Sequence, residues 1–135
     1  MKVLVETPRY SFRKYRKTGG GFKVDLTSPL PTLFNYGIVG GTKGADGLPH
    51  DVVVLGRRVR QATVLEVEKV GLVKFIDDGL MDDKIVASED GRISRIDVFK
   101  IKLFFLAYSV FKKIRGLVKT GKIPKTSFGG FIPVR

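Results

Sequence analysis

Two aspartates, Asp46 and Asp51, flank a short loop that leads directly into an apolar segment. The loop reads GADGLPHD (residues 44–51) and is broken by Gly47 and Pro49. Carboxylate oxygens held at the start of a strand are suitable ligands for a hard cation such as Mg²⁺. The residue midway between the aspartates is Leu48, which offers no ligand atom. The stretch is therefore a metal site, a metal site that has lost one ligand, or a turn.

A second acidic stretch lies further along the chain. The segment DDGLMDD (77–83) contains four of the protein's 13 acidic residues, although the chain is otherwise basic. Carboxylates crowded together repel one another unless a cation neutralises them. This clustering favours a metal site, and a solvated acidic loop is the simpler alternative.

The net charge of the chain is unusual. Twenty-five Lys and Arg face 13 Asp and Glu in 135 residues, for a formal charge of +12. The segment Val98–Arg135 contains nine basic residues and no acid, and residues 9–23 contain six basic residues and no acid. Such a balance indicates a polyanionic partner, either a phosphate compound, nucleic acid or a membrane surface, unless it serves solubility alone.

Composition excludes several classes of protein. The chain has no cysteine, so disulfides, thiolate catalysis and cysteine-based zinc sites are excluded. No apolar run approaches the ~18 residues of a membrane helix, and the first residues lack the apolar run of a signal peptide. We expect a soluble cytoplasmic protein without a membrane-spanning part. At this length we expect one domain over residues 1–135.

Short β-branched segments predict strands in the first two thirds of the chain. Strands are expected at 2–6, 51–56, 63–76 and 84–88, with a hairpin that turns at residues 18–21. Gly71 lies inside the third of these strands and predicts a bulge. The C-terminal tail is expected to add a short edge strand.

One segment has helical periodicity, and it follows the strands. Its apolar residues recur at spacings of three and four, which predicts a helix over roughly 95–119 with this face toward the sheet. Ser94 and Asp97 resemble an N-terminal capping box, and Gly121 is a C-terminal signal. The fold class is therefore α+β and mainly β, with one main C-terminal helix. The positions on this face are Ile101, Phe104, Phe105, Tyr108, Phe111 and Ile114 or Arg115.

Five short motifs together resemble the family I inorganic pyrophosphatases, which are soluble and Mg-dependent. Each motif is weak alone, but all five occur in the family's order and spacing. They are VETPRYSFRKY (5–15), FNYG (34–37), DGLPHDVVVL (46–55), VGLVKFIDDGLMDDKIVA (70–87) and FFLAY (104–108).

The resemblance implies a fold, an activity and a set of site residues. The fold would be an OB-like five-stranded antiparallel barrel with the helix on its flank, assembled as a homohexamer. The activity would be hydrolysis of pyrophosphate to phosphate with several Mg²⁺ ions, or Mn²⁺. By position in the motifs, the metal ligands would be Asp46, Asp51, Asp77, Asp82 and Glu6, and the substrate would contact Lys14, Lys84, Tyr36 and Tyr108.

Three departures from the family pattern indicate weak activity. Leu48 stands where the family has an aspartate that is thought to orient and deprotonate the attacking water. Leu26 and Ser109 stand where the family has a phosphate-binding arginine and a lysine. No general base is therefore assigned, and the phosphates would be less neutralised than in the family.

Nearby residues are candidates to replace the missing groups. His50, Asp78 and Asp83 lie beside the matched acids and are candidate bases, although strand alternation would direct each of these two aspartates away from its neighbour. Lys112 and Lys113 lie one helical turn beyond the family's lysine position and are candidate phosphate contacts.

Two other functions remain open at this point. The chain could be a non-catalytic relative that binds metal and phosphate compounds or nucleic acid, which the basic charge favours. It could also be a structural subunit. Five metal-type carboxylates argue against the structural role, because buried acids without partners would destabilise the fold.

Overall fold

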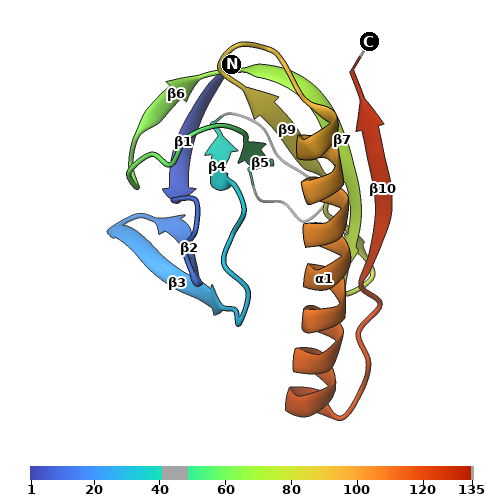
Figure 1. Ribbon diagram of the computed structural model, residues 1–135. Helices are drawn as coiled ribbons and strands as arrows, with labels where there is room; N and C mark the ends of the chain where they lie inside the picture. The colour runs from blue at the N-terminus through green and yellow to red at the C-terminus, as the bar shows by residue number, and fades with distance from the viewer. Residues whose placement is uncertain (41–48, 135) are drawn as a thin grey trace.

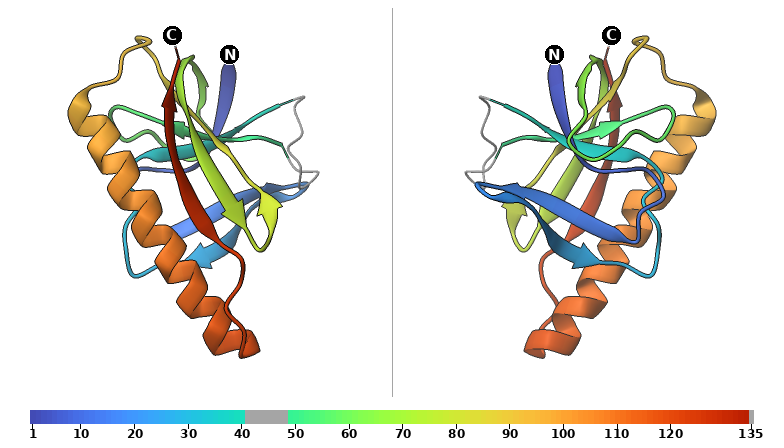
Figure 2. Two further views of the ribbon diagram at one scale, coloured as in Figure 1. Left: turned by 90° about the vertical axis from the view of Figure 1, so that its right-hand side faces the viewer. Right: turned by 90° about the vertical axis from the view of Figure 1, so that its left-hand side faces the viewer.

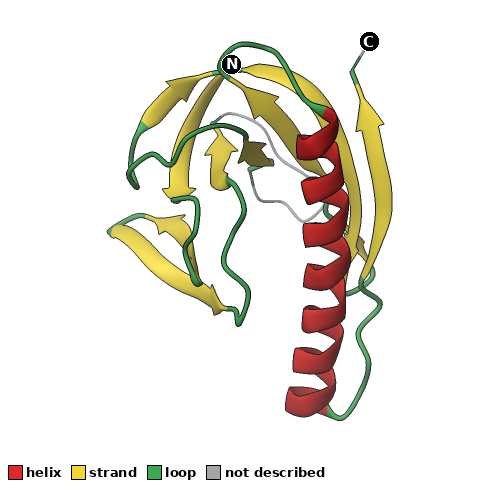
Figure 3. Cartoon of the chain, in the orientation of Figure 1, coloured by secondary structure: helices red, strands yellow, loops and turns green. Residues whose placement is uncertain are grey.

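A computed structural model describes residues 1–40 and 49–134, which form a strongly curved β-structure with one long helix along its side (Figure 1). The strands are β1 (Lys2–Thr7), β2 (Arg13–Thr18), β3 (Gly21–Thr27), β4 (Asn35–Val39), β5 (Asp51–Val54), β6 (Val64–Glu66), β7 (Glu68–Asp77), β8 (Leu80–Met81), β9 (Lys84–Ser88) and β10 (Ser127–Pro133). The helix is α1 (Arg95–Thr120), the one red element in Figure 3.

Most strands belong to one curved sheet. Its order is β10-β7-β9-β5-β4-β1-β6, with β8 paired to β7, while β2 and β3 form a separate hairpin. All pairs are antiparallel except β5 and β9, which run parallel with Val52 opposite Ile85. The expected hairpin turn and the bulge at Gly71 are both present.

Helix α1 ends where its sequence signals predict. Ser94 Oγ accepts the N–H of Asp97, and the Asp97 carboxylate accepts the N–H of Ser94, so the capping box forms. Such a cap stabilises a helix by ~1 kcal/mol. Gly121 closes the other end with φ 73°, a left-handed conformation that glycine adopts without strain. The expected helix over roughly 95–119 is confirmed within one residue.

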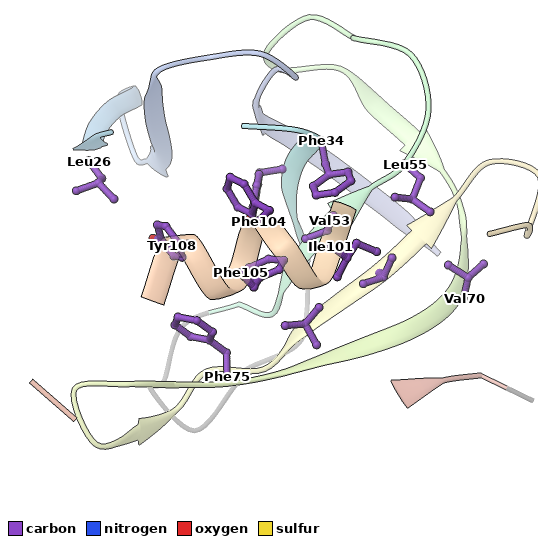
Figure 4. Packing of buried hydrophobic residues seen from close by; sticks show 13 residues of the cluster. Leu26, Phe34, Val53, Leu55, Val70, Phe75, Ile101, Phe104, Phe105 and Tyr108 are labelled. Carbon is purple, nitrogen blue, oxygen red and sulfur yellow. The ribbon is translucent and has the colours of Figure 1, made fainter. Parts of the chain in front are cut away.

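The main core lies between α1 and the concave face of the sheet. Phe104, Phe105 and Tyr108 point from the helix toward Phe75 and Val53 on the sheet (Figure 4). The rings of Phe104 and Tyr108 are stacked, with their centroids 5.9 Å apart. Phe111 packs at the edge of this cluster, as the helical spacing predicts, whereas Ile114 is exposed and does not continue the buried face.

A smaller core lies on the other face of the sheet. It contains Val52 and Val54, whereas Val53 belongs to the main core, because successive side chains of a strand point to opposite faces. Strand β5 is therefore buried on both faces, which explains its uninterrupted apolar sequence.

The mainly-β class with one C-terminal helix is confirmed, with two differences from a five-stranded antiparallel barrel. Between β6 and β10 the sheet does not close within the described residues, and one strand pair is parallel. The two side views show the open, curved sheet with α1 across its flank (Figure 2). Among residues 1–40 and 49–134, no helix is long and apolar enough to cross a membrane.

Candidate functional site

A buried lysine joins two of the predicted metal ligands. Lys84 is 2% exposed, and its Nζ donates to Asp51 Oδ2 at 2.6 Å and to Asp82 Oδ2 at 2.7 Å. The parallel pairing of β5 and β9 is the reason, since Asp51 and Lys84 are the first residues of these two strands and start at the same edge. The acidic loop and the acidic stretch thus meet at one ammonium group.

The charges in this triplet stabilise one another. Burial by itself would raise the pKa of Asp51, but Lys84 and then Lys14 outweigh burial and lower this pKa. Burial would likewise lower the pKa of Lys84, and the charge of Asp51 outweighs it and raises this pKa. Asp51 and Lys84 therefore both stay ionised at neutral pH.

Lys14 lies against two tyrosine rings at the same site. Its Nζ is 5.0 Å from the ring centroid of Tyr36 and 5.4 Å from that of Tyr108, which are cation–π distances. Lys14 comes from β2, Tyr36 from β4 and Tyr108 from α1. Within the described chain Lys14 makes no ion pair. The two tyrosine rings therefore position this ammonium group at the site.

The site also perturbs the pKa of Lys14 and of Tyr36. Burial alone would lower the pKa of Lys14, but the acidic groups of Tyr108 and Asp51 outweigh it and raise this pKa well above its usual value. Burial raises the pKa of Tyr36 well above its usual value, against the opposing effect of Lys14. At neutral pH the site therefore presents the charged amine of Lys14 beside the neutral phenol of Tyr36.

Glu6 lies next to these groups on strand β1. It is 6% exposed, and its Oε2 accepts the backbone N–H of Lys17 at 2.6 Å. Burial raises the pKa of Glu6; the bond from Lys17 opposes this shift, and the charge of Asp51 adds to it. This hydrogen bond, and those between Thr7 and Tyr15, attach the separate β2–β3 hairpin to β1.

Asp77 has its own lysine, which also lies over the ring of Tyr108. Lys112 forms an ion pair with Asp77, and its Nζ is 5.5 Å from the ring centroid of Tyr108. Thr126 Oγ1 donates to the second oxygen of Asp77 at 3.3 Å. Tyr108 thus has an ammonium group from Lys14 and one from Lys112 over its ring.

The structure directs one of the three candidate replacement bases, Asp83, away from the triplet. Asp83 pairs with Lys74 at 2.7 Å and accepts the N–H of Phe75, so it points away from Asp82 as strand alternation predicts. Asp78 lies in the turn after β7 with φ 51°. The carbonyl of His50 accepts the N–H of Val39. Asp46 and Leu48 lie outside the described residues.

Leu26 and Ser109, which stand where the family has phosphate-binding cations, are both buried. Leu26 is 5% exposed and belongs to the main core, where it lines a small cavity with Lys14, Tyr36 and Tyr108. Ser109 is 2% exposed, and its Oγ donates to the carbonyl of Leu106 at 2.7 Å. Neither position carries a cation, and Leu26 turns this part of the site apolar.

The donor set at the triplet fits a magnesium ion in part. Within residues 1–40 and 49–134, no three acidic or histidine side chains gather closely enough to hold a metal ion. Asp51 and Asp82 nevertheless direct one oxygen each to the same cation, the ammonium of Lys84. Magnesium is often bound by one or two carboxylates together with substrate phosphates. The pair fits that chemistry when a phosphate ligand completes the coordination.

Sequence reasoning missed two roles. It assigned Lys84 to phosphate alone, although this lysine forms ion pairs with two aspartates, and it did not pair Lys112 with Asp77. Alternation in the segment Asp82–Lys84 was an available signal, because residues two apart on a strand share a face. Nothing in the local sequence indicated the contact between Lys112 and Asp77, which are 35 residues apart.

The chain is similar to known proteins along most of its length. A sequence profile described as "Inorganic pyrophosphatase" matches residues 3–126. A protein from Halalkalibacterium halodurans named "Inorganic pyrophosphatase" is 31% identical over 129 residues, which cover 86% of this chain and 79% of that protein. A rice protein named "Soluble inorganic pyrophosphatase" is 42% identical over 89 residues, or 62% of this chain. The match spans only 42% of the rice protein's length.

The fold is also that of a solved structure. The inorganic pyrophosphatase from Helicobacter pylori matches with a TM-score of 0.79 and 25% sequence identity. The superposition covers 98% of this chain and 84% of that structure. The expected OB-like fold class is therefore confirmed for the described part of the chain.

Proposed function

Because the chain belongs to the inorganic pyrophosphatase family, we propose that it hydrolyses pyrophosphate to phosphate with Mg²⁺, and at a reduced rate. One observation carries the proposal. The triplet of Asp51, Lys84 and Asp82 adjoins an ammonium group, that of Lys14, which makes no ion pair within the described chain. The site thus offers carboxylates for a cation and ammonium groups for phosphate.

The residues divide into two roles. Asp51 and Asp82 would hold Mg²⁺ or Mn²⁺, with Asp46, Asp77 and Glu6 as further ligands by resemblance to the family. The chemistry that a bound Mg²⁺ supplies is a lower pKa for a coordinated water and neutralisation of phosphate charge. In the described residues, Lys84 bonds only the Oδ2 atom of each aspartate, which leaves both Oδ1 atoms for a metal.

The lysines would bind and orient the substrate. Lys14 and Lys84 would offset the negative charge of the two phosphates, and charge that develops on the leaving phosphate is stabilised by such fixed cations. Tyr36 and Tyr108 hold Lys14 in place and exclude water from its stem. Lys112 replaces part of the missing cationic charge at the helix, because it reaches the ring of Tyr108.

The reduced rate follows from Leu48 and Leu26. A leucine cannot accept a proton from water, and loss of a general base typically costs ~10²–10⁴-fold in rate. The buried position of Leu26 supports a second deficit, because no guanidinium fits there without burying its charge among core side chains.

A phosphate-release assay tests this function. Purified protein is incubated with pyrophosphate or ATP, with Mg²⁺, with Mn²⁺ and with EDTA. We expect slow, metal-dependent release from pyrophosphate, which Asp51→Asn reduces further. Lys69→Gln is the control, since Lys69 is exposed and distant from the site in the pairing of β7 with β9. Release that persists in EDTA, or that Asp51→Asn leaves unchanged, contradicts the proposal.

We also propose that the protein is a homo-oligomer, a hexamer by resemblance to the family. The supporting observation is an outer stripe on α1, opposite its buried face, with side chains 44–66% exposed at spacings of three and four. A helix that is apolar on two opposite faces needs a second partner. The outer stripe consists of Ile96, Phe99, Leu103, Leu106, Val110, Ile114 and Leu117.

The alternative function is binding without catalysis, to phosphate compounds or nucleic acid. The net charge of +12 and the exposed basic residues of the β2–β3 hairpin favour it. We would expect single-stranded DNA to bind at low salt, with affinity that falls steeply as salt rises.

We further propose that the protein is cytoplasmic and that residues 1–135 form one domain.

A further inference from the structure

A basic hollow of about 620 Å³ lies at the C-terminal end of α1. It is bounded by the last turns of the helix, by the segment 121–126 that leads into β10, and by the turn between β7 and β8. Figure 2 shows this end of the helix extending beyond the sheet. The cationic residues that line the hollow are Lys112, Arg115, Lys119, Lys122 and Lys125.

The hollow has more positive charge than its own acids neutralise. Asp77 and Asp78 are its acidic lining residues, and Asp77 already pairs with Lys112. In the described part of the chain, the other four cations form no ion pair. The helix dipole favours a cation such as Lys119 in the last turn, but it does not account for Lys122 and Lys125 beyond the helix end. An anion with several charges would relieve their mutual repulsion.

One residue, Lys112, links the hollow to the candidate active site. Lys112 lines the hollow, and its Nζ also lies over the ring of Tyr108, on which the ammonium of Lys14 lies as well. Ammonium groups therefore follow one another from Lys84 and Lys14 through Lys112 to the hollow. Pyrophosphate has only two phosphates and uses the first part of this series.

The lining indicates which anion fits. Its volume is in the range of ligand sites, ~300–1,000 Å³, but its walls are mainly charged. No aromatic side chain is among the described lining residues, so the hollow offers no surface on which a base could stack. A chain of phosphates without bases matches these walls better than a nucleic acid does.

We propose that the basic hollow binds inorganic polyphosphate of three or more phosphates, whose terminal phosphates lie in the candidate active site. The placement of the terminal phosphates rests on the proposed function. The binding of polyphosphate by the hollow does not, because it depends only on the charges and the cavity.

Binding is measured by calorimetry in EDTA, where metal-dependent turnover cannot interfere. The ligands are pyrophosphate, tripolyphosphate, a longer polyphosphate and single-stranded DNA at one fixed ionic strength. The test variant is Lys119→Gln/Lys122→Gln/Lys125→Gln. The control variant is Lys2→Gln/Lys69→Gln/Lys100→Gln, which loses the same charge from positions outside the hollow.

The wild type should bind tripolyphosphate more tightly than pyrophosphate. The test variant should lose about tenfold or more in affinity for tripolyphosphate and longer chains, with less than about threefold lost for pyrophosphate. The control variant should lose less than about threefold for every ligand. Equal losses in both variants, or equal affinity of the wild type for the two phosphates, overturns the proposal. Tighter binding of DNA than polyphosphate through the three hollow lysines also overturns it.

The two proposals fail separately. If pyrophosphate is not hydrolysed but tripolyphosphate affinity still depends on the hollow lysines, the proposed activity is wrong and the polyphosphate site stands. If pyrophosphate is hydrolysed and the hollow lysines have no effect on tripolyphosphate binding, the polyphosphate site is wrong and the proposed activity stands.

Discussion

The Asp51 carboxylate and the Lys84 ammonium meet at 2.6 Å although 33 residues separate them in the chain. The parallel pairing of β5 with β9 brings them together, and Asp82 joins them at 2.7 Å from the same ammonium. One buried cation therefore bridges two carboxylates from two acidic segments. Lys84 stabilises the fold at the point where the proposed metal and phosphate would bind.

Replacing Lys84 should destabilise the protein strongly. Lys84→Met leaves Asp51 and Asp82 without their cation, and the loss of one partner of a buried ion pair costs ~3–5 kcal/mol. We expect about 3 kcal/mol, at the lower end, because the two aspartate side chains are 28% and 21% exposed. Urea unfolding measures the change in free energy of unfolding.

Lys74→Met is the matched control for this substitution. Lys74 pairs with Asp83 at 2.7 Å, but its side chain is 39% exposed, and such a pair is worth only ~0–1 kcal/mol. Added Mg²⁺ should restore part of the stability of Lys84→Met, since a cation would again lie between Asp51 and Asp82. Equal losses in the two variants would show that Lys84 is not an essential counter-ion.

Divalent cations should raise the thermal stability of the wild type. A ligand that binds only the folded protein at 100 times its dissociation constant stabilises it by ~2.7 kcal/mol. Melting curves with Mg²⁺, Mn²⁺ and no metal measure the effect, which Asp51→Asn should reduce. An unchanged melting temperature at millimolar metal would mean that the carboxylates serve only as partners of the lysines.

The Glu6 carboxyl should make stability depend on pH in the absence of metal. Burial raises its pKa in the folded state above the ordinary value of ~4.3, so the folded protein holds this proton more tightly than the unfolded chain does. The resulting stability is full below the ordinary pKa and is lost as pH rises through the raised pKa. Glu6→Gln removes this loss, because an amide does not ionise. The amide oxygen can still accept the N–H of Lys17.

The free energy of unfolding of Glu6→Gln, relative to that of the wild type, should therefore be higher at pH 7 than at pH 4. Chemical denaturation in EDTA at the two pH values measures it. A difference that favours the variant more at pH 4 would reverse the sign and refute the assignment.

The outer stripe of α1 should control association. Leu106→Glu places a charge in the centre of this stripe and should convert the oligomer into smaller species, as measured by light scattering. Val64→Glu is the control, because Val64 is also exposed but lies on β6, away from the helix. When two copies associate through this stripe, basic residues such as Arg95 and Lys113 would lie near those of the other copy and repel them. Salt screens this repulsion and should therefore strengthen wild-type association. A monomeric wild type at all concentrations would exclude the oligomer.

Local signals in the sequence predicted the local structure well. Ser94 and Gly121 define the helix ends, and the glycines after Thr18 define the hairpin turn, because caps and turns depend on adjacent residues. Alternation also separated Asp82 from Asp83, which point to different lysines. These features need no knowledge of distant contacts.

Features that depend on distant pairing were not predictable in the same way. The parallel register of β5 and β9 gives no local signal, so the contact between Lys84 and Asp51 could not be derived from neighbouring residues. The sequence also identified Leu26 as a departure from the family. It did not reveal that the side chain is part of the main core, so Leu26→Arg is expected to cost stability rather than simply add a phosphate contact.

The initial rate of pyrophosphate hydrolysis, compared between the wild type and Leu48→Asp, tests the central claim most directly. We propose a metal-dependent site that lacks its base, so the wild type should be slow and Leu48→Asp should be faster at every Mg²⁺ concentration. The gain should stay below the ~10²–10⁴-fold usually assigned to a base, because Leu26 and Ser109 leave the phosphates less neutralised. Rapid wild-type hydrolysis that Leu48→Asp does not increase would contradict the claim and show that another group activates the water.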